Sequence, residues 1–195
     1  IEARYGDRLA EQADRLAHHA LRGGLWEKAA NYARQMGDRA ATLCVDAEAV
    51  AFYHQAIETL ERLPATRETA CLGIDIRLAL RAPLWRGGQL ERLLEIFRAA
   101  EALASQFDET ERLDVVYSFF VQYYWAKGEY AQAIAYGQRC LETADRRDDL
   151  GLRVTGLYYM GASYQAQGQF PRALDHFMQI IERLDGPRAS ERFGL

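Results

Sequence analysis

The sequence predicts an all-α protein built from antiparallel helical hairpins, and three observations support this fold class. A ten-residue pattern recurs in one register at intervals of forty residues, beginning at Trp85, Trp125 and Gln165, and such internal repetition is typical of helical arrays. Elsewhere apolar residues return at helical spacing, whereas no long stretch alternates apolar and polar residues like a half-buried strand. The chain also has only four prolines, which leaves room for long helices.

The composition excludes several classes of protein. Apolar residues make up 49% and charged residues 27% of the 195 residues, as in folded globular proteins rather than disordered ones. The net charge of −4 provides no basic surface for nucleic acid. No apolar run approaches the roughly 18 residues of a membrane span, and the N-terminus lacks the apolar core of a signal peptide. We therefore expect a cytoplasmic protein with neither nucleic acid nor a membrane as its partner.

The three cysteines, Cys44, Cys71 and Cys140, lie far apart and are odd in number, which does not suggest a disulfide framework. Each is expected to be a small, buried thiol in a reducing compartment. The chain starts at Ile1 rather than at methionine, so we expect it to be a fragment of a longer protein.

Start and stop signals divide the first third of the chain into four expected helices. Asp7 is a suitable N-cap for the first helix, and Gly24 lies at its end. Gly37 is expected to end the second helix, and a short helical piece follows. Asp46 then caps a long helix that Pro64 closes. The expected helices are 7–21, 26–36, 39–45 and 46–63.

The rest of the chain is expected to hold six more helices. The first begins at Thr66 or Thr69, and Pro83 should kink it or break it at Ala82 because proline disturbs the preceding turn. Pro171 suits the first turn of the last helix, where its missing N–H costs nothing. The expected helices are 66–84, 90–104, 108–127, 130–147, 148 or 149 to 167, and 170–184; residues 188–195 are either a linker or the start of a truncated next helix.

The forty-residue register assigns structural roles to the repeated positions. Gly88, Gly128 and Gly168 fall at hairpin turns, where glycine tolerates a positive φ without a Cβ penalty. A large apolar residue two positions later is expected to cover the turn, and a large aliphatic residue six positions later is expected to fill the contact between the two helices. The covering residues are Leu90, Tyr130 and Phe170, and the aliphatic residues are Leu94, Ile134 and Leu174.

These residues resemble the tetratricopeptide repeat (TPR) family, which has glycine at the hairpin turn, an aromatic residue two positions later and an alanine–aliphatic pair beyond it. The resemblance implies a right-handed α-solenoid in which residues 1–187 form a single array. Its hairpins would lie near 7–37, 39–63, 66–104, 108–147 and 149–185. The period exceeds the family's usual length of about 34 residues. It is similar to that of arrays beside bacterial AAA/STAND ATPases, in adenylate or guanylate cyclases and in LuxR-type regulators.

No residue pattern points to catalysis or to a cofactor. The chain lacks a phosphate loop and a nucleophile elbow. His18 and His19 are adjacent, so on a helix their side chains would point about 100° apart and could not easily share a metal ion. Many carboxylates have arginine partners at helical spacing, as Glu58 and Arg62 illustrate. We expect that the chain is not an enzyme and that it has no catalytic residue, no cofactor and no metal.

The candidate binding residues follow from the family resemblance. The first helix of each TPR hairpin lines a concave groove, and the matching positions in this chain are expected to face that groove. They are Trp85, Ser118, Gln122, Trp125, Tyr158 and Gln165. Tyrosine and tryptophan offer a large contact area with a polar handle. The aromatic residues crowded between positions 117 and 125 keep two interpretations open, because such rings either fill the core or contact a partner.

The sequence thus favours a non-catalytic scaffold that binds a protein partner or itself. The resemblance places it within a larger bacterial signalling protein, such as an adenylate or guanylate cyclase or an AAA ATPase. A homodimer is expected because the end of a solenoid exposes apolar surface. The alternative is a sensor of a small effector, as in LuxR-like regulators, with an aromatic wall near Tyr123, Trp125 and Tyr158 that stacks on a sugar or a planar ligand.

Overall fold

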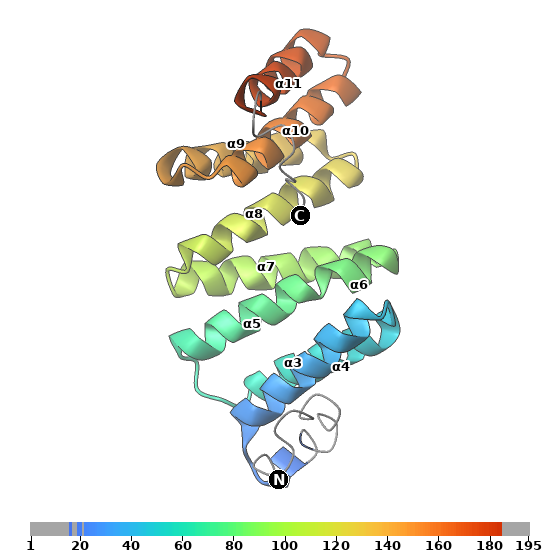
Figure 1. Cartoon of the computed structure of the whole chain (residues 1–195), viewed down its shortest axis with the longest axis vertical. Helices are drawn as coiled ribbons and strands as arrows, with labels where there is room; N and C mark the ends of the chain where they lie inside the picture. The colour runs from blue at the N-terminus through green and yellow to red at the C-terminus, as the bar shows by residue number, and fades with distance from the viewer. Residues whose placement is uncertain (1–15, 17–18, 21, 185–195) are drawn as a thin grey trace. The chain divides into compact units, whose positions relative to one another are not determined.

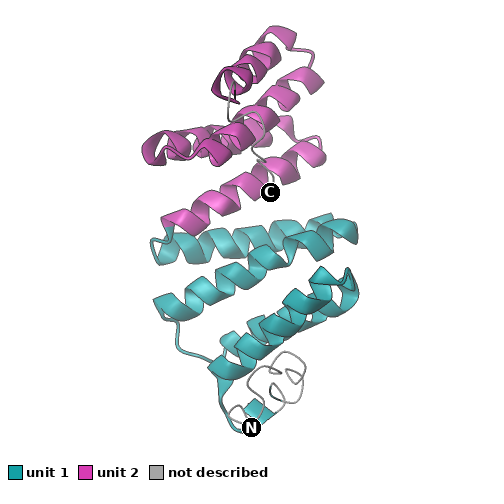
Figure 2. Cartoon of the chain, in the orientation of Figure 1, with its two compact units in different colours: residues 1–109 teal, residues 110–195 magenta. Residues whose placement is uncertain are grey.

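A computed structural model describes residues 16, 19–20 and 22–184, and within them it contains the helices α3 to α11 and no strand (Figure 1). The all-α prediction is confirmed. The helix predicted at 7–21 falls almost entirely outside the described residues, and the segment 188–195 falls wholly outside them. The helices divide between two compact units, which we call unit 1 (residues 1–109) and unit 2 (residues 110–195) (Figure 2). That residues 1–187 form one array stays a prediction.

The described residues of unit 1 form two helical hairpins between Trp26 and Gln106. In the first, α3 (Trp26–Thr42) packs along α4 (Asp46–Leu60). In the second, α7 (Leu90–Gln106) packs along two shorter helices in succession, α5 (Arg67–Ala79) and α6 (Arg81–Arg86). An ion pair between Arg86 and Asp46 links α6 to the start of α4.

The stop predicted at Gly37 is wrong, because α3 runs unbroken through this residue. Gly37 is buried inside the helix, and a Cβ atom there would stand 2.7 Å from the ring of Tyr53 in α4. The missing side chain therefore lets the two helices approach each other closely. The Tyr53 hydroxyl donates a hydrogen bond of 2.7 Å to the carboxylate of Asp38, which fixes the ring over the glycine.

The short helix predicted at 39–45 is likewise wrong, since residues 39–42 belong to α3. The hairpins expected near 7–37 and 39–63 are corrected accordingly: α3 is the first helix of a hairpin whose second helix is α4. The turn between them is at Cys44, which has a φ of 57°. A glycine inside a helix and a glycine after a helix look alike in sequence, and only the close approach of α4 distinguishes them.

The helix predicted over 66–84 begins as expected and breaks earlier than expected. Thr66 caps α5 by accepting a hydrogen bond from the Thr69 N–H, and the Thr69 side chain returns a bond to the Thr66 N–H. The break lies at Leu80 rather than at Ala82. Pro83 has no N–H for the carbonyl four residues before it and its ring crowds that carbonyl, so α5 ends at that residue, Ala79.

In unit 2, the residues that the structure describes form two hairpins of longer helices. In the first, α8 (Thr110–Ala126) pairs with α9 (Tyr130–Arg147). In the second, α10 (Leu150–Ala166) pairs with α11 (Phe170–Leu184). The helix α10 also packs along α9 and reaches α8, so consecutive hairpins share a continuous apolar interior.

One turn geometry recurs along the described chain. Residues with positive φ follow the helices at Gly24, Cys44, Gly88, Asp108, Gly128, Asp148 and Gly168. From Gly88 onward these positions are twenty residues apart. After each of them the next N–H bonds to the carbonyl five residues earlier, at 2.8 to 3.1 Å, which is the Schellman bond that caps a helix. The glycine turns predicted at 88, 128 and 168 are confirmed.

Candidate partner-binding site

Three of the predicted binding residues lie together in unit 2. Trp125 is in the last turn of α8, whereas Tyr158 and Gln165 lie on α10, and all three line one open groove of about 700 Å³. We call this the aromatic groove. Its remaining lining residues are Ala126, Tyr130, Ala162, Ala166 and Phe177. The three alanines are small and leave room between the rings for a flat apolar side chain or a helix.

The rings of the aromatic groove hold one another in place. Trp125 meets Tyr159 edge-on, with 5.6 Å between ring centroids. Tyr159 meets Tyr158 edge-on at 5.1 Å, and Tyr158 lies 6.2 Å from Phe177 of α11. Edge-to-face contacts of this length are favourable. Helices α8, α10 and α11 therefore present a connected row of aromatic side chains.

Two of these rings remain accessible. Trp125 is 38% exposed and Tyr158 is 49% exposed, which is unusual for large aromatic residues in a packed helical array. Accessible tryptophan and tyrosine are the residue types that contribute most to binding at protein interfaces. The groove thus has the composition of a contact surface.

Two predicted binding residues of α8 are buried instead. Ser118 is 1% exposed and its hydroxyl donates a hydrogen bond of 2.6 Å to the carbonyl of Val115. Gln122 is 9% exposed. Neither lines the aromatic groove, and a buried side chain offers no contact to a partner, so both are left out of the candidate site. The sixth residue, Trp85, is in α6 of unit 1, where it is 37% exposed.

Most of the crowded aromatic residues of α8 form the core. Phe120 stacks on Tyr136 of α9 with 4.5 Å between centroids, and Tyr124 stacks on the same ring at 5.5 Å. Phe119 and Tyr123 are also buried. In the aromatic wall expected near Tyr123, Trp125 and Tyr158, only Trp125 and Tyr158 are exposed and available to a ligand. Most rings between positions 117 and 125 therefore fill the core, whereas Trp125 is exposed to a partner.

A second exposed apolar surface runs along α11, and the sequence reasoning did not single it out. We call it the α11 stripe. It consists of Phe170 (65% exposed), Leu174 (61%), Met178 (44%) and Ile181 (60%). Phe170 and Leu174 had been expected to cover a turn and fill a helix contact, and their exposure corrects that expectation. The spacing of these residues, with successive steps of four, four and three, was the available signal, since it places them on one helix face.

Charged side chains close the opposite end of unit 2. Arg147, at the end of α9, forms ion pairs of 2.8 Å with Asp114 and Glu111 of α8. Asp114 is nearly buried, whereas Glu111 is exposed. Below them, burial raises the pKa of the Cys140 thiol to about 12, and the nearby Asp114 adds to this. Cys140 is therefore a core residue and not an activated nucleophile.

Two further classes of site were sought in the part of the chain that the structure describes. No group of three or more His, Cys, Asp or Glu side chains there is placed to hold a metal ion. Nor does any helix among those residues have the length and apolar character required to cross a membrane.

Comparisons with known proteins agree with the fold. The tetratricopeptide repeat family matches residues 114–186. The crystal structure of BtubC (BKLC) from P. vanneervenii is similar, with a TM-score of 0.70 over 93% of this chain and 76% of that chain and a sequence identity of 16%. No curated protein sequence matches this chain. Tetratricopeptide repeats generally mediate protein–protein interactions and are typically non-catalytic. The match to a tetratricopeptide-type repeat at residues 114–186 spans both the aromatic groove and the α11 stripe.

Proposed function

We propose that this chain is a non-catalytic protein-interaction and self-association module of a larger bacterial signalling protein. The observation that carries the proposal is the α11 stripe, because four large apolar side chains on one helix face are exposed to water. Burying such a face is favourable by about 25 cal/mol for each Å² of apolar surface removed from water. Exposed patches of this kind mark protein contact sites.

The forty-residue register supports a helix as the element that covers the stripe. Leu174 and Ile181 occupy the places that Ile134 and Leu141 hold in α9, and both of those residues are partly buried. Leu141 lies against α10, where a Cβ atom added to Gly156 would stand 3.2 Å from its side chain. The equivalent surface of α9 is covered by α10. A helix from a second copy of the chain would cover the α11 stripe in the same way.

Sedimentation velocity tests the self-association. The unaltered chain is expected to form a dimer whose fraction rises with concentration, and Leu174→Glu with Ile181→Glu is expected to leave a monomer. Gln179→Glu is the control for added charge, since Gln179 lies on the other side of α11 and is exposed, so it introduces one negative charge without touching the stripe. A monomer at every concentration, or a dimer that survives the double substitution, would contradict the proposal.

The aromatic groove supports a second surface for a protein partner. Trp125 and Tyr158 provide exposed rings and Gln165 provides an exposed amide at one edge. A peptide or a helix with an apolar anchor fits such a groove, since the rings supply contact area at little conformational cost. Trp85 in unit 1, which shares the repeat position of Trp125 and Gln165, is assigned the same role in its own unit.

The runner-up function is the sensing of a small effector by this groove. The row of rings formed by Trp125, Tyr159 and Tyr158 favours it, because a sugar or a planar molecule stacks on exposed rings. Tryptophan fluorescence titrated against a panel of metabolites distinguishes the two functions. A saturable shift that Trp125→Ala abolishes and Trp85→Phe preserves supports sensing, whereas a silent panel together with self-association supports the interaction module.

The proposed signalling context rests on the forty-residue period, which is similar to that of arrays beside bacterial AAA/STAND ATPases. In that arrangement the array would dock or pair the larger proteins while another domain carries out the chemistry. Sequencing the flanking coding region tests this: a phosphate loop or a cyclase domain upstream in the same reading frame supports the assignment, and a complete frame without either sinks it.

A further inference from the structure

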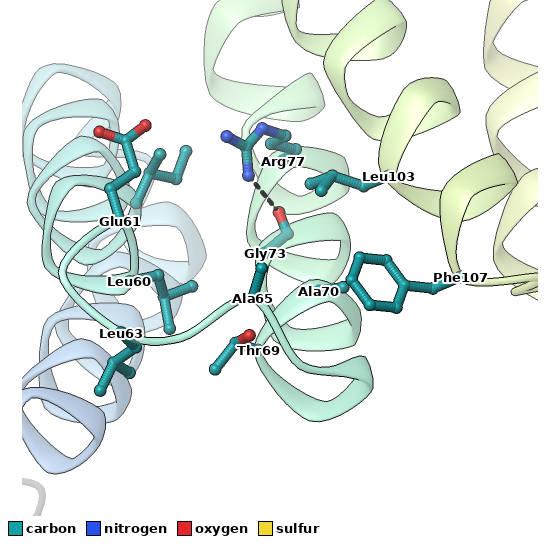
Figure 3. A pocket seen from close by; sticks show the side chains of 11 residues that line it. Leu60, Glu61, Leu63, Ala65, Thr69, Ala70, Gly73, Arg77, Leu103 and Phe107 are labelled. Atoms are coloured by element: carbon teal, nitrogen blue, oxygen red, sulfur yellow. Dashed lines mark hydrogen bonds between the residues drawn. The ribbon is translucent and has the colours of Figure 1, made fainter.

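Unit 1 contains a cavity of about 240 Å³ that the TPR resemblance does not explain. It lies between the end of α4, the loop that follows, α5 and the end of α7 (Figure 3). The size suits a small molecule rather than a helix. The cavity is separate from the aromatic groove, which belongs to unit 2.

Most of the cavity wall is apolar. Leu60 comes from α4 and Ala70 from α5, whereas Leu103 and Phe107 come from α7 and its end (Figure 3). Leu60 and Ala70 are buried. Water gains few hydrogen bonds against such a wall, so an apolar group displaces it readily.

A guanidinium group stands at one side of this apolar space. Arg77 lines the cavity and donates one hydrogen bond of 3.0 Å to the carbonyl of Gly73, one turn back on α5 (Figure 3). The side chain is partly buried, and this desolvation lowers the pKa of Arg77, while the charge of Glu61 partly offsets the effect. A guanidinium has five N–H donors, and among the described residues no carboxylate is ion-paired with this one.

A carboxylate stands across the opening from Arg77. Glu61 follows α4 as its C-cap residue, lines the same cavity and is exposed. Figure 3 shows its side chain and that of Arg77 on facing sides of the cavity. The two charges influence each other electrostatically but form no direct ion pair. One anionic and one cationic group thus flank an apolar space without neutralising each other at contact distance.

We propose that this cavity binds an apolar α-amino acid as its zwitterion, with the carboxylate on Arg77, the ammonium group on Glu61 and the side chain against Leu60, Leu103 and Phe107. Arginine suits the carboxylate because its planar fork donates two parallel hydrogen bonds. The ammonium group of the ligand supplies the positive charge that pairs with the Glu61 carboxylate. An aliphatic or aromatic side chain of leucine, methionine or phenylalanine size fills the remaining apolar volume.

The pairing of charges excludes simpler ligands. A carboxylic acid without an amino group would bring its anion close to Glu61 with no compensating cation. An amine without a carboxylate would leave the desolvated guanidinium of Arg77 unsatisfied. Removing one charged partner from a partly buried hydrogen bond costs about 1.5–3 kcal/mol, which corresponds to at least about a tenfold loss of affinity.

A ligand series on the unaltered chain tests the proposal without relying on any variant. Isothermal titration calorimetry would compare leucine with isocaproate, which lacks the ammonium group, and with isoamylamine, which lacks the carboxylate. Leucine is expected to bind at least about tenfold more tightly than either analogue. Isocaproate that binds as well as leucine would overturn the zwitterion assignment, and so would a series in which none of the three binds.

Two variants locate the site. Glu61→Gln is expected to weaken leucine about tenfold while leaving isocaproate unchanged or tighter, and Arg77→Met is expected to abolish leucine binding. Glu95→Gln and Arg98→Met are the matched controls, because both residues are exposed on α7. Circular dichroism would verify that each variant is folded. Leucine binding that persists in both site variants contradicts the assignment, and the outcome is independent of self-association through α11.

Discussion

Arg92 of α7 donates a hydrogen bond to the Nε2 atom of His54 in α4. Arginine has no acceptor, so the imidazole accepts with an unprotonated nitrogen and is neutral in the folded state. Burial is the main cause that lowers the pKa of His54, and the charge of Arg92 adds to it, while Glu58 partly offsets the shift. The contact joins the two hairpins of unit 1 through a histidine that is neutral in the folded state.

The stability of the chain should therefore fall on mild acidification. The folded pKa of His54 lies below its unfolded value of 6.5, so the unfolded state binds the proton first as the pH drops. The contribution of His54 is complete above the unfolded pKa and is lost as the pH falls toward the folded pKa. Urea midpoints measured between pH 7.5 and pH 5 should decline more steeply for the unaltered chain than for His54→Gln. The same substitution at His176, in unit 2, serves as the control, and parallel slopes for all three proteins would refute the prediction.

Gly37→Ala should destabilise unit 1 even though alanine is the better helix former. Propensity alone would favour the change by up to about 1 kcal/mol, but the new Cβ atom would stand 2.7 Å from the Tyr53 ring. Overpacking of this kind costs about 1–3 kcal/mol. Urea unfolding would measure the net loss, and combining the substitution with Tyr53→Val should recover part of it. A more stable Gly37→Ala protein would show that the two helices are free to separate.

Asp114 and Glu111 share the guanidinium of Arg147 but differ in burial, which gives a matched pair of substitutions. Asp114→Asn should lower the urea midpoint clearly, because the carboxylate is 8% exposed and its partner would be left without a buried counter-charge. Glu111→Gln should change the midpoint little, since its side chain is 79% exposed and water screens the pair. Equal effects would mean that burial does not set the strength of these contacts.

Thiol labelling should separate the cysteines by burial. Cys44 is exposed, contrary to the buried position expected from its residue type, while Cys140 is buried with a pKa raised to about 12. At pH 8 the Cys140 thiol therefore stays protonated, and the thiolate is the reactive form. A disulfide reagent should therefore show a fast phase that Cys44→Ser removes. Cys140 should react only after denaturant is added, and its rapid labelling in the folded chain would contradict the packing of α9 against α10.

The repeat register predicted α7 to α11 well because glycine and the residues around it carry the turn geometry in their own chemistry. The same turn is formed at Cys44, Asp108 and Asp148 without glycine, whereas the sequence pattern offers Asp148 as one of two residues that open a helix. Asp149 is the residue that caps α10, by accepting a hydrogen bond from the Leu152 N–H. A non-glycine residue adopts a positive φ only where the packing of the two flanking helices requires it, and a local sequence pattern does not contain that information.

Burial was harder to predict than helix position. Ser118 and Trp125 both came from the family's groove pattern, yet one is enclosed and the other is open. Leu141 and Ile181 share a repeat position, yet only Leu141 is partly covered, by α10. Equivalent residues therefore acquire different exposures from their neighbours in space, and the candidate site emerged only when those neighbours were in place.

The Schellman turns are spaced twenty residues apart, so one helical hairpin with its two turns spans forty residues. The hairpin is therefore the natural unit by which this chain changes length. Deleting residues 129–168 would join Gly128 to Gln169, and the Gln169 N–H would still find the carbonyl of Tyr124 five positions back. Every later side chain would keep its face. A deletion of twenty residues would preserve the turn but reverse the direction of all that follows, turning apolar faces outward. Duplication and loss during evolution are thereby confined to multiples of forty, while each hairpin surface remains free to acquire its own ligand.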